Sequence, residues 1–201
     1  MTNRPQHRVR QSGFSLMEVM VSMVILAVGM LSVLATLGIM MGATATSQED
    51  MFARQLASEA MESIFAARNN SQIPFSSIAN TSAVPPGIFI PGNNAPKCAG
   101  PDGILDTADD VSCTTSSGAT CPNGGVACVT EPGPDGLVGT ADDQIVSLNN
   151  FTRNIAITPL LDSSGNTIPT LVQVTITINY TVPNHSGTKS YVLDEYISSY
   201  H

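Results

Sequence analysis

The hydrophobic and polar positions at the start of the chain predict one long helix with two different halves. Residues 14–41 are apolar almost throughout, whereas residues 42–68 place apolar side chains three and four positions apart. A helix that is apolar all round needs lipid or protein around it, and a helix with one apolar stripe packs that stripe on a core. We therefore expect a continuous helix of roughly 80 Å, at about 1.5 Å per residue, that ends near residue 68.

Residues 151–201 alternate in the way that predicts an antiparallel β-sheet. Between residues 172 and 180, apolar and polar side chains alternate over nine positions, which is the period of a strand with one buried face. Residues 151–158 and 189–197 are expected to form two further strands, with turn residues between them. The fold class that follows is α+β, with the long N-terminal helix packed on a small antiparallel sheet.

Residues 69–150 show no sustained period and contain nine of the 13 prolines and all four cysteines. Loops of this length in a compact domain need something to hold them. We expect disulfides, for which three pairings are possible, and the pairing of sequence neighbours is the simplest. A zinc site is the alternative, but the spacings are irregular and no Cys-x-x-Cys or nearby His is present. The candidate residues are Cys98, Cys113, Cys121 and Cys128.

An internal repeat is the second feature of this region. The eleven residues from Gly100 to Asp110 return from Gly133 to Asp143 with eight identities. Both copies place carboxylates beside glycine turns, and calcium takes about six to eight oxygen ligands in flexible geometry. We expect calcium at these copies, and the alternative is a pair of Asp-Gly turns with solvated carboxylates. The candidate ligands are Asp102, Asp106, Asp109, Asp110, Asp135, Asp142 and Asp143.

Charge is scarce and unevenly placed along the chain. Only 12% of the 201 residues are charged and 42% are hydrophobic, with a net charge of −8. The first 13 residues carry three arginines and no acid, and the remainder carries five basic and 16 acidic residues, a net charge of −11. An acidic chain repels phosphates, which argues against nucleic acid as a partner. Arginines before an apolar span place the N-terminus in the cytoplasm and the remainder outside, where disulfides form.

Residues 13–18 have the sequence GFSLME, and they follow this basic leader directly. This segment resembles the processing site of type IV prepilins and pseudopilins. That site consists of a short basic leader that ends in Gly, then a Phe, a carboxylate four residues later and a long apolar helix. The stretch from residue 18 to residue 31 is most similar to PilV-type minor pilins. The resemblance covers roughly the first 65 residues, and it implies a type IV pilin-like fold.

The resemblance also implies a maturation path and a set of partners. A prepilin peptidase would cut between Gly13 and Phe14 on the cytoplasmic side, and it would methylate the new amine to give N-methylphenylalanine. The single-pass helix of residues 14–41 would wait in the bacterial inner membrane with the head in the periplasm. An inner-membrane assembly platform would then move it into a filament of pilin or pseudopilin subunits, which in a pilus is extracellular.

Glu18 is the one charged residue within the apolar run. A carboxylate inside a bilayer costs several kcal/mol unless it is paired. The only cation nearby in sequence is the amine of Phe14 that cleavage would create. In the family this carboxylate attracts the amine of a neighbouring subunit, so the resemblance implies an assembly role. A carboxylate that snorkels to the membrane edge is the alternative.

The sequence contains no nucleotide-binding loop, zincin motif or nucleophile elbow, so we expect no enzyme and no organic cofactor. The leading hypothesis is a minor pilin, a structural subunit that primes or decorates a type IV pilus. A minor pseudopilin of a type II secretion system is the alternative within the family. The repeated Asp loop is similar in character to the calcium loop of major pseudopilins, which favours calcium there. A membrane-anchored calcium-dependent adhesin that never polymerises is the alternative outside it.

Overall fold

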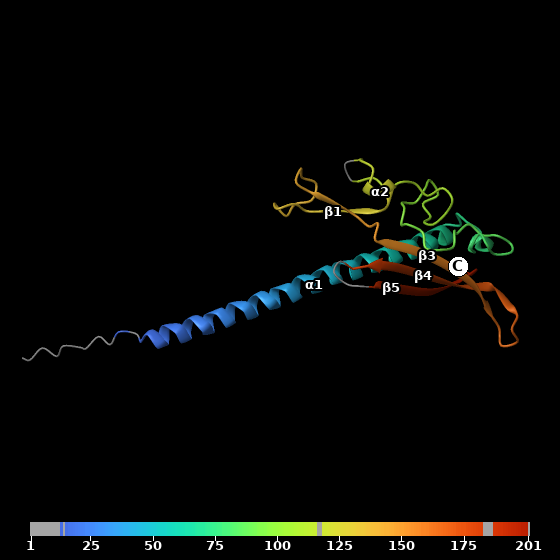
Figure 1. Cartoon of the computed structure of the whole chain (residues 1–201). Helices are drawn as coiled ribbons and strands as arrows, with labels where there is room; N and C mark the ends of the chain where they lie inside the picture. Colours follow the sequence, from blue (N-terminus) through green and yellow to red (C-terminus); the bar gives the residue numbers. More distant parts are fainter. Residues whose placement is uncertain (1–12, 14, 116–117, 183–186, 201) are drawn as a thin grey trace, which may run out of the picture. The chain divides into compact units, whose positions relative to one another are not determined.

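The computed structural model describes residues 13, 15–115, 118–182 and 187–200 (Figure 1). The chain forms two units, the first ending at Thr44 and the second beginning at Ala45. One helix, α1 (Leu16–Asn69), contributes residues to both. The expected helix end near residue 68 is therefore confirmed to within one residue, whereas the basic leader and Phe14 lie outside the described residues.

The first unit consists of the apolar part of α1. Every described residue up to Thr44 is exposed, and this unit contains most of the exposed large hydrophobic side chains of the described residues. The hydroxyls of Ser22, Ser32 and Thr36 donate hydrogen bonds of 2.8–2.9 Å to carbonyl oxygens one turn earlier. These polar groups are thereby satisfied inside the helix itself, which suits an apolar surrounding. Among the described residues, α1 is long and apolar enough to cross a membrane.

The second unit contains a three-stranded antiparallel sheet in the order β3-β4-β5. Its strands are β3 (Phe151–Leu161), β4 (Thr167–Thr181) and β5 (Thr188–Ser198), so the three predicted strands are confirmed and each extends beyond its predicted limits. Strand β3 continues through Pro159, which faces Val172 beside a register shift. Proline is tolerated there because β3 is an edge strand and needs no outward ladder donor at that position.

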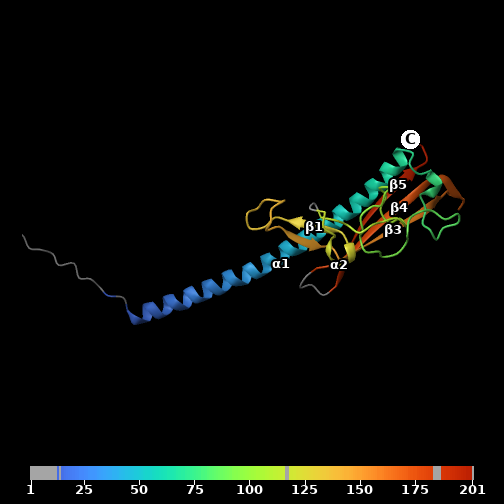
Figure 2. The same cartoon turned by 90° about the horizontal axis from the view of Figure 1, so that it is seen from above.

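The core lies between this sheet and the second part of α1, which run side by side in Figures 1 and 2. Alternate residues of β4 point inward, and Val174, Ile176 and Ile178 are fully buried. The buried stripe of α1 is rich in alanine, and small side chains let the helix axis approach the sheet closely. The buried residues of α1 are Ala53, Leu56, Ala57, Ala60, Met61, Ile64 and Ala67. The predicted α+β fold is confirmed.

The region between α1 and β3 contains short elements that the sequence did not indicate. They are the 3-10 helix η1 (Phe75–Ser77), the short helix α2 (Pro122–Gly125) and the strands β1 (Cys128–Glu131) and β2 (Gln144–Ser147). Strands β1 and β2 pair antiparallel as a separate two-stranded sheet. Four residues are too few to show a period of two, so these strands could not be distinguished from loop in the sequence.

The same region covers the free edge of β3 with side-chain and backbone hydrogen bonds. The amide of Asn80 donates to the carbonyl of Ile155 at 2.7 Å and accepts from the N–H of Ile157 at 2.8 Å. Further along, Asn94 and Arg153 exchange two backbone hydrogen bonds of 2.8 and 2.9 Å. Asn80 thus takes the place of a neighbouring strand and satisfies buried backbone groups.

Candidate functional site

The start of α1 places the predicted processing segment in an exposed position. Gly13 is exposed, and the carbonyl of Ser15 accepts hydrogen bonds from the N–H groups of Glu18 and Val19. Glu18 therefore lies in the first turn, where the positive end of the helix dipole favours a carboxylate. Neither ion pair found among the described residues involves Glu18. Phe14, the predicted methylated residue, lies outside the described residues.

The first Asp loop (residues 100–110) is a compact turn held by its own carboxylates. Asp102 accepts a hydrogen bond from the N–H of Ile104 at 2.9 Å, and Asp110 accepts one from Asp106 at 2.9 Å. The hydroxyl of Thr107 lies 2.7 Å from Asp109 and 3.4 Å from both Asp102 and Asp110. Three of the four predicted calcium ligands of this copy therefore converge on one hydroxyl group.

The second Asp loop (residues 133–143) repeats most of these hydrogen bonds, apart from the contact between Thr107 and Asp102. Asp135 accepts from the N–H of Leu137 at 2.9 Å, and Asp143 accepts from Gly139 at 2.6 Å. The hydroxyl of Thr140 lies 2.7 Å from Asp142. The sequence repeat is thus a structural repeat, in which Asp142 and Asp143 occupy the positions that Asp109 and Asp110 hold in the first copy.

Two glycine positions explain why the repeat tolerates so little change. A Cβ atom on Gly100 would lie 2.3 Å from the carbonyl oxygen of Asp109, and one on Gly133 would lie 2.2 Å from the carboxylate of Asp142. Each loop therefore closes on itself only because the first residue lacks a side chain. The variable seventh position has a positive φ in both copies, 59° at Asp106 and 96° at Gly139. Asp and Gly both tolerate this conformation better than most residues.

The two loops differ in what they pack against. Ile104 and Leu105 of the first copy are 1% and 2% exposed, whereas their counterparts Leu137 and Val138 are 62% and 64% exposed. The first loop is anchored by hydrogen bonds to other segments, including one from the N–H of Ile90 to the carbonyl of Asp106 at 2.8 Å. The first copy is therefore part of the head core, and the second projects from the β1–β2 sheet.

Hydrogen bonds and burial set the protonation of the loop carboxylates in opposite directions. The hydroxyl of Thr107 lowers the pKa of Asp109, and the hydroxyl of Thr140 lowers the pKa of Asp142. Burial instead raises the pKa of Asp110. Within the part of the chain that the structure describes, no three His, Cys, Asp or Glu side chains form a group that could hold a metal ion. Calcium at these loops therefore stays a prediction.

Two disulfides cross-link the segment that surrounds the first loop. Cys98 pairs with Cys113, and Cys121 pairs with Cys128, so the structure selects the pairing of sequence neighbours from the three possibilities. No free thiol remains among the four cysteines. A zinc site made of these cysteines would need them as free thiolates, so the disulfide-bonded cysteines do not offer one.

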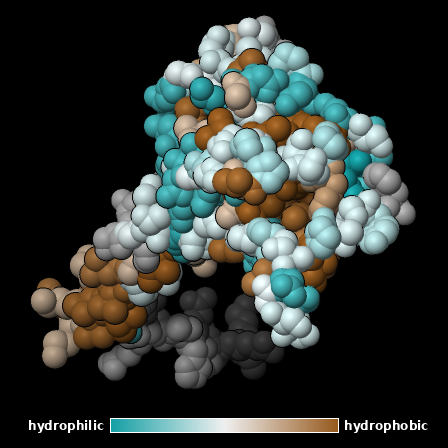
Figure 3. Space-filling view, turned by 90° about the vertical axis from the view of Figure 1, so that its right-hand side faces the viewer, coloured by the Kyte–Doolittle hydropathy of each residue, from teal (hydrophilic) through white to brown (hydrophobic). Residues whose placement is uncertain are grey.

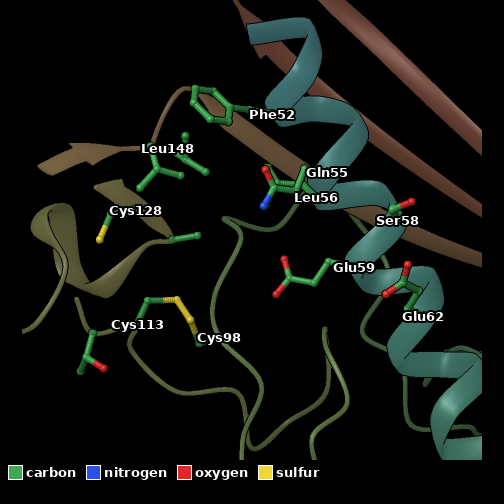
Figure 4. Close-up of a pocket in the computed structure, with 13 residues that line it drawn as sticks. Phe52, Gln55, Leu56, Ser58, Glu59, Glu62, Cys98, Cys113, Cys128 and Leu148 are labelled. Atoms are coloured by element: carbon green, nitrogen blue, oxygen red, sulfur yellow. A yellow bond between two sulfur atoms is a disulfide. The ribbon is translucent and has the colours of Figure 1, made fainter. Parts of the chain in front are cut away.

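A groove of about 490 Å³ lies between α1 and the disulfide region (Figure 4). From α1 it is lined by Phe52, Gln55, Leu56, Ser58, Glu59 and Glu62, and across from them lie both disulfides and Leu148. Figure 4 shows Gln55 and Glu59 directed into the space that faces the cysteines. The helix periodicity in the sequence identified the polar face of α1, but the loop segments opposite it come together only through the tertiary fold.

A polar cluster that the sequence did not indicate ties α1 to the sheet. The carboxylate of Asp50 accepts from the hydroxyl of Tyr180 at 2.7 Å and from Lys189 at 3.1 Å. The hydrogen bond from Tyr180 lowers the pKa of Asp50, and burial raises the pKa of Tyr180 to about 12. Arg54 lies over the ring of Tyr191 at 5.7 Å.

Elsewhere on the head, hydrophilic and hydrophobic residues are mixed on the surface (Figure 3).

Comparison with known proteins identifies the N-terminal segment. Residues 8–34 match the prokaryotic N-terminal methylation motif. No curated protein and no solved structure matches the chain. The motif indicates a type IV pilin-like or pseudopilin-like protein, and the long helix with an antiparallel sheet is consistent with that fold. The motif suggests a structural subunit that assembles with other pilin-like subunits and is a substrate of prepilin peptidase, and the one apolar helix among the described residues suggests membrane anchoring.

Proposed function

We propose that this protein is a minor pilin of the PilV type, a subunit that primes or decorates a type IV pilus. The observation that carries the proposal is the methylation motif at residues 8–34, which includes the start of one exposed apolar helix with Glu18 in its first turn. An apolar surface of this extent is unfavourable in water. A membrane before assembly and a bundle of subunits after assembly would both cover it.

The proposed mechanism assigns a step to each residue of the segment. Prepilin peptidase cuts between Gly13 and Phe14 and methylates the amine of Phe14. The head resides in the periplasm and the helix in the inner membrane until the assembly platform extracts the subunit. In the filament, the carboxylate of Glu18 pairs with the Phe14 amine of a neighbouring subunit. A buried charge that lacks this partner costs several kcal/mol, so the pair selects one axial register.

The processing step is tested by replacing Gly13 with arginine. Gly13 has open space around it in the structure, so the substitution changes the cleavage site without disturbing packing. Uncut precursor in the membrane fraction is the expected result, whereas wild-type protein starts with N-methylphenylalanine by mass spectrometry. A mature wild-type N-terminus at any other residue contradicts the proposal.

The assembly step is tested by Glu18→Ala in the full-length chain. We expect normal cleavage but a loss of about tenfold or more from sheared filaments, because about 1.4 kcal/mol of lost pairing already corresponds to a factor of ten. Glu195→Ala is the matched control, because Glu195 is an exposed acid on β5. Wild-type incorporation of Glu18→Ala contradicts the assembly role of Glu18. Absence of the wild-type protein from sheared filaments contradicts a polymer subunit and supports the membrane-anchored adhesin.

The choice between pilus and secretion pseudopilus is tested by the genetic requirement for surface display. Deleting the assembly ATPase of the pilus system removes the protein from sheared surface filaments if it is a minor pilin. If surface display instead requires only the type II secretion ATPase, and deletion of this protein blocks secretion, the protein is a minor pseudopilin.

We further propose that the two Asp loops bind calcium. The support is the convergence of Asp102, Asp109 and Asp110 around Thr107 and the repetition of the same turn in the second loop. Backbone carbonyls and waters complete the oxygen ligands that calcium prefers. Calcium bound to the folded state alone raises the melting temperature, and a concentration 100 times the Kd adds about 2.7 kcal/mol.

Calcium binding is tested by melting the full-length protein in detergent with calcium and with EGTA. The double variant Asp109→Asn, Asp142→Asn is expected to lose the calcium-dependent rise. Asp162→Asn is the control, because Asp162 caps an unrelated turn through Ser164 and Asn166. A wild-type melting temperature that calcium does not change contradicts a structural site.

A further inference from the structure

The groove between α1 and the disulfide region, which we name the α1 groove, has an apolar floor and an acidic rim. Leu56 and Leu148 are 5% and 4% exposed and lie at its base. Glu59 and Glu62 lie on the rim, one turn apart on the same face of α1, and both are exposed. The volume of about 490 Å³ falls in the range of about 300–1,000 Å³ that is typical of binding pockets.

The α1 groove carries only negative charge. Its lining includes two carboxylates, and no Lys, Arg or His is found among those lining residues that the structure describes. Both ion pairs of the described residues use other acids, Asp106 and Asp50. Arg54 beside Gln55 and Lys97 beside Cys98 are next to lining residues in the sequence, but neither is part of the lining. The groove therefore attracts a cation from outside the chain.

A second copy of the chain has few cations to offer. Beyond Gly13 the sequence contains five basic residues against 16 acids. Arg153 is buried in its pair with Asp106, and Lys189 is paired with Asp50. Arg54 lies over Tyr191, and Arg68 donates to the carbonyl of Tyr200. Of the five, this leaves Lys97, which is exposed and belongs to neither ion pair of the described residues. An association between two such acidic surfaces is electrostatically unfavourable.

We propose that the α1 groove docks a segment of a different subunit that presents an apolar side chain beside a lysine or arginine. The apolar side chain fills the floor at Leu56 and Leu148, and the cation lies between Glu59 and Glu62. Apolar burial supplies affinity, and the charges select the partner and its orientation. This inference rests on the proposed function in one respect: the partner is expected to be another subunit of the same filament.

The test is photocrosslinking of the full-length chain in cells that also produce the other subunits. Ser58 is replaced by p-benzoyl-phenylalanine, because it is exposed and lines the groove between Gln55 and Glu62. The expected product is an adduct with a different subunit, whose crosslinked peptide, sequenced by mass spectrometry, has Lys or Arg within about one helical turn of the crosslinked residue. An adduct with a second copy of this chain, with an acidic peptide, or with no protein at all overturns the proposal.

Charge reversal gives the decisive comparison. Glu59→Lys, Glu62→Lys should reduce the adduct about tenfold or more, because like charges at an interface cost several kcal/mol. Glu195→Lys should leave it unchanged. Reversing the partner's basic residue to Glu should restore the adduct with the reversed groove, which a merely misfolded variant could not do. An adduct that is unaffected by the double reversal overturns the proposal.

The neutral variant Glu59→Gln, Glu62→Gln controls for the possibility that charge reversal lowers the adduct yield by misfolding the head. It retains the shape of both side chains and is expected to give an intermediate adduct yield, whereas wild-type yield would contradict the role of charge. N-terminal cleavage and filament incorporation are measured on the same cells. A groove adduct in a protein that never enters filaments refutes the pilin proposal alone, and incorporation without an adduct refutes the groove proposal alone.

Discussion

The guanidinium of Arg153 on β3 donates a 2.6 Å hydrogen bond to the carboxylate of Asp106, and the two side chains are only 1% and 4% exposed. The two residues are 47 positions apart in the chain. This contact attaches the first Asp loop to the sheet, and it is absent from the second loop, where Gly139 replaces Asp106. The pair is therefore the main electrostatic difference between two loops of otherwise equal conformation.

Removing one member of this pair should strongly destabilise the head. Arg153→Met leaves the Asp106 carboxylate buried without its partner, and such changes cost about 3–5 kcal/mol. Adding Asp106→Asn removes the charge while retaining a residue that tolerates a positive φ, so the double variant should recover part of the loss. Urea unfolding followed by circular dichroism measures both, and equal stability of wild type and Arg153→Met contradicts the prediction.

The two Asp loops form a matched pair for testing burial. Ile104→Ala removes a side chain that is 1% exposed and should cost about 2–5 kcal/mol through lost contacts and a cavity. Leu137→Ala changes the equivalent position of the second loop, which is 62% exposed, and should stay within about 0.5 kcal/mol of wild type. Comparable losses at both positions would show that the second loop is packed as well.

The cluster at Asp50 predicts how the stability of the head depends on pH, at both the acidic and the basic end of the range. Because the pKa of Asp50 is lowered by Tyr180 and Lys189, its contribution to stability is present above its unfolded pKa of about 3.9 and is lost as the pH falls through the folded value. The pKa of Tyr180 is raised to about 12. Its contribution is present below its unfolded pKa of about 10 and is lost as the pH rises through 12.

Phenolate absorbance provides the measurement for this cluster. A titration component near pH 12 should be present in wild type and absent from Tyr180→Phe. Asp50→Asn should move that component to lower pH, because the carboxylate that opposes ionisation of the phenol is gone. A component that stays in place in Asp50→Asn contradicts the contribution of Asp50.

The two disulfides should differ in their contribution to stability. Cys98 and Cys113 close a loop with a sequence separation of 15, whereas Cys121 and Cys128 are separated by seven. Chain entropy assigns about 3 kcal/mol to the longer loop and about 2 kcal/mol to the shorter one. Unfolding of Cys98→Ser, Cys113→Ser and of Cys121→Ser, Cys128→Ser measures the difference, and a larger loss from the shorter loop would reverse the expected order.

Local pattern was sufficient for the long elements of this fold, α1, β3, β4 and β5. The three- and four-residue spacing in α1 and the alternation in β4 predicted both elements, because side-chain direction repeats with a fixed period in each. The strands β1 and β2 were missed because four residues carry too little pattern. The processing segment was also evident from local sequence, since its leader, glycine and carboxylate are adjacent in the chain.

The sequence by itself determined that this protein has one long helix, an antiparallel sheet, an N-terminal methylation motif at residues 8–34 and two copies of an Asp loop. Only the tertiary structure decided how those loops differ and what surrounds them. Ile104 is buried and Leu137 is exposed although both loops form the same turn, because burial depends on Arg153 and other residues far away in the chain. The α1 groove has the same origin, since α1 and the disulfide region meet only when the head is folded.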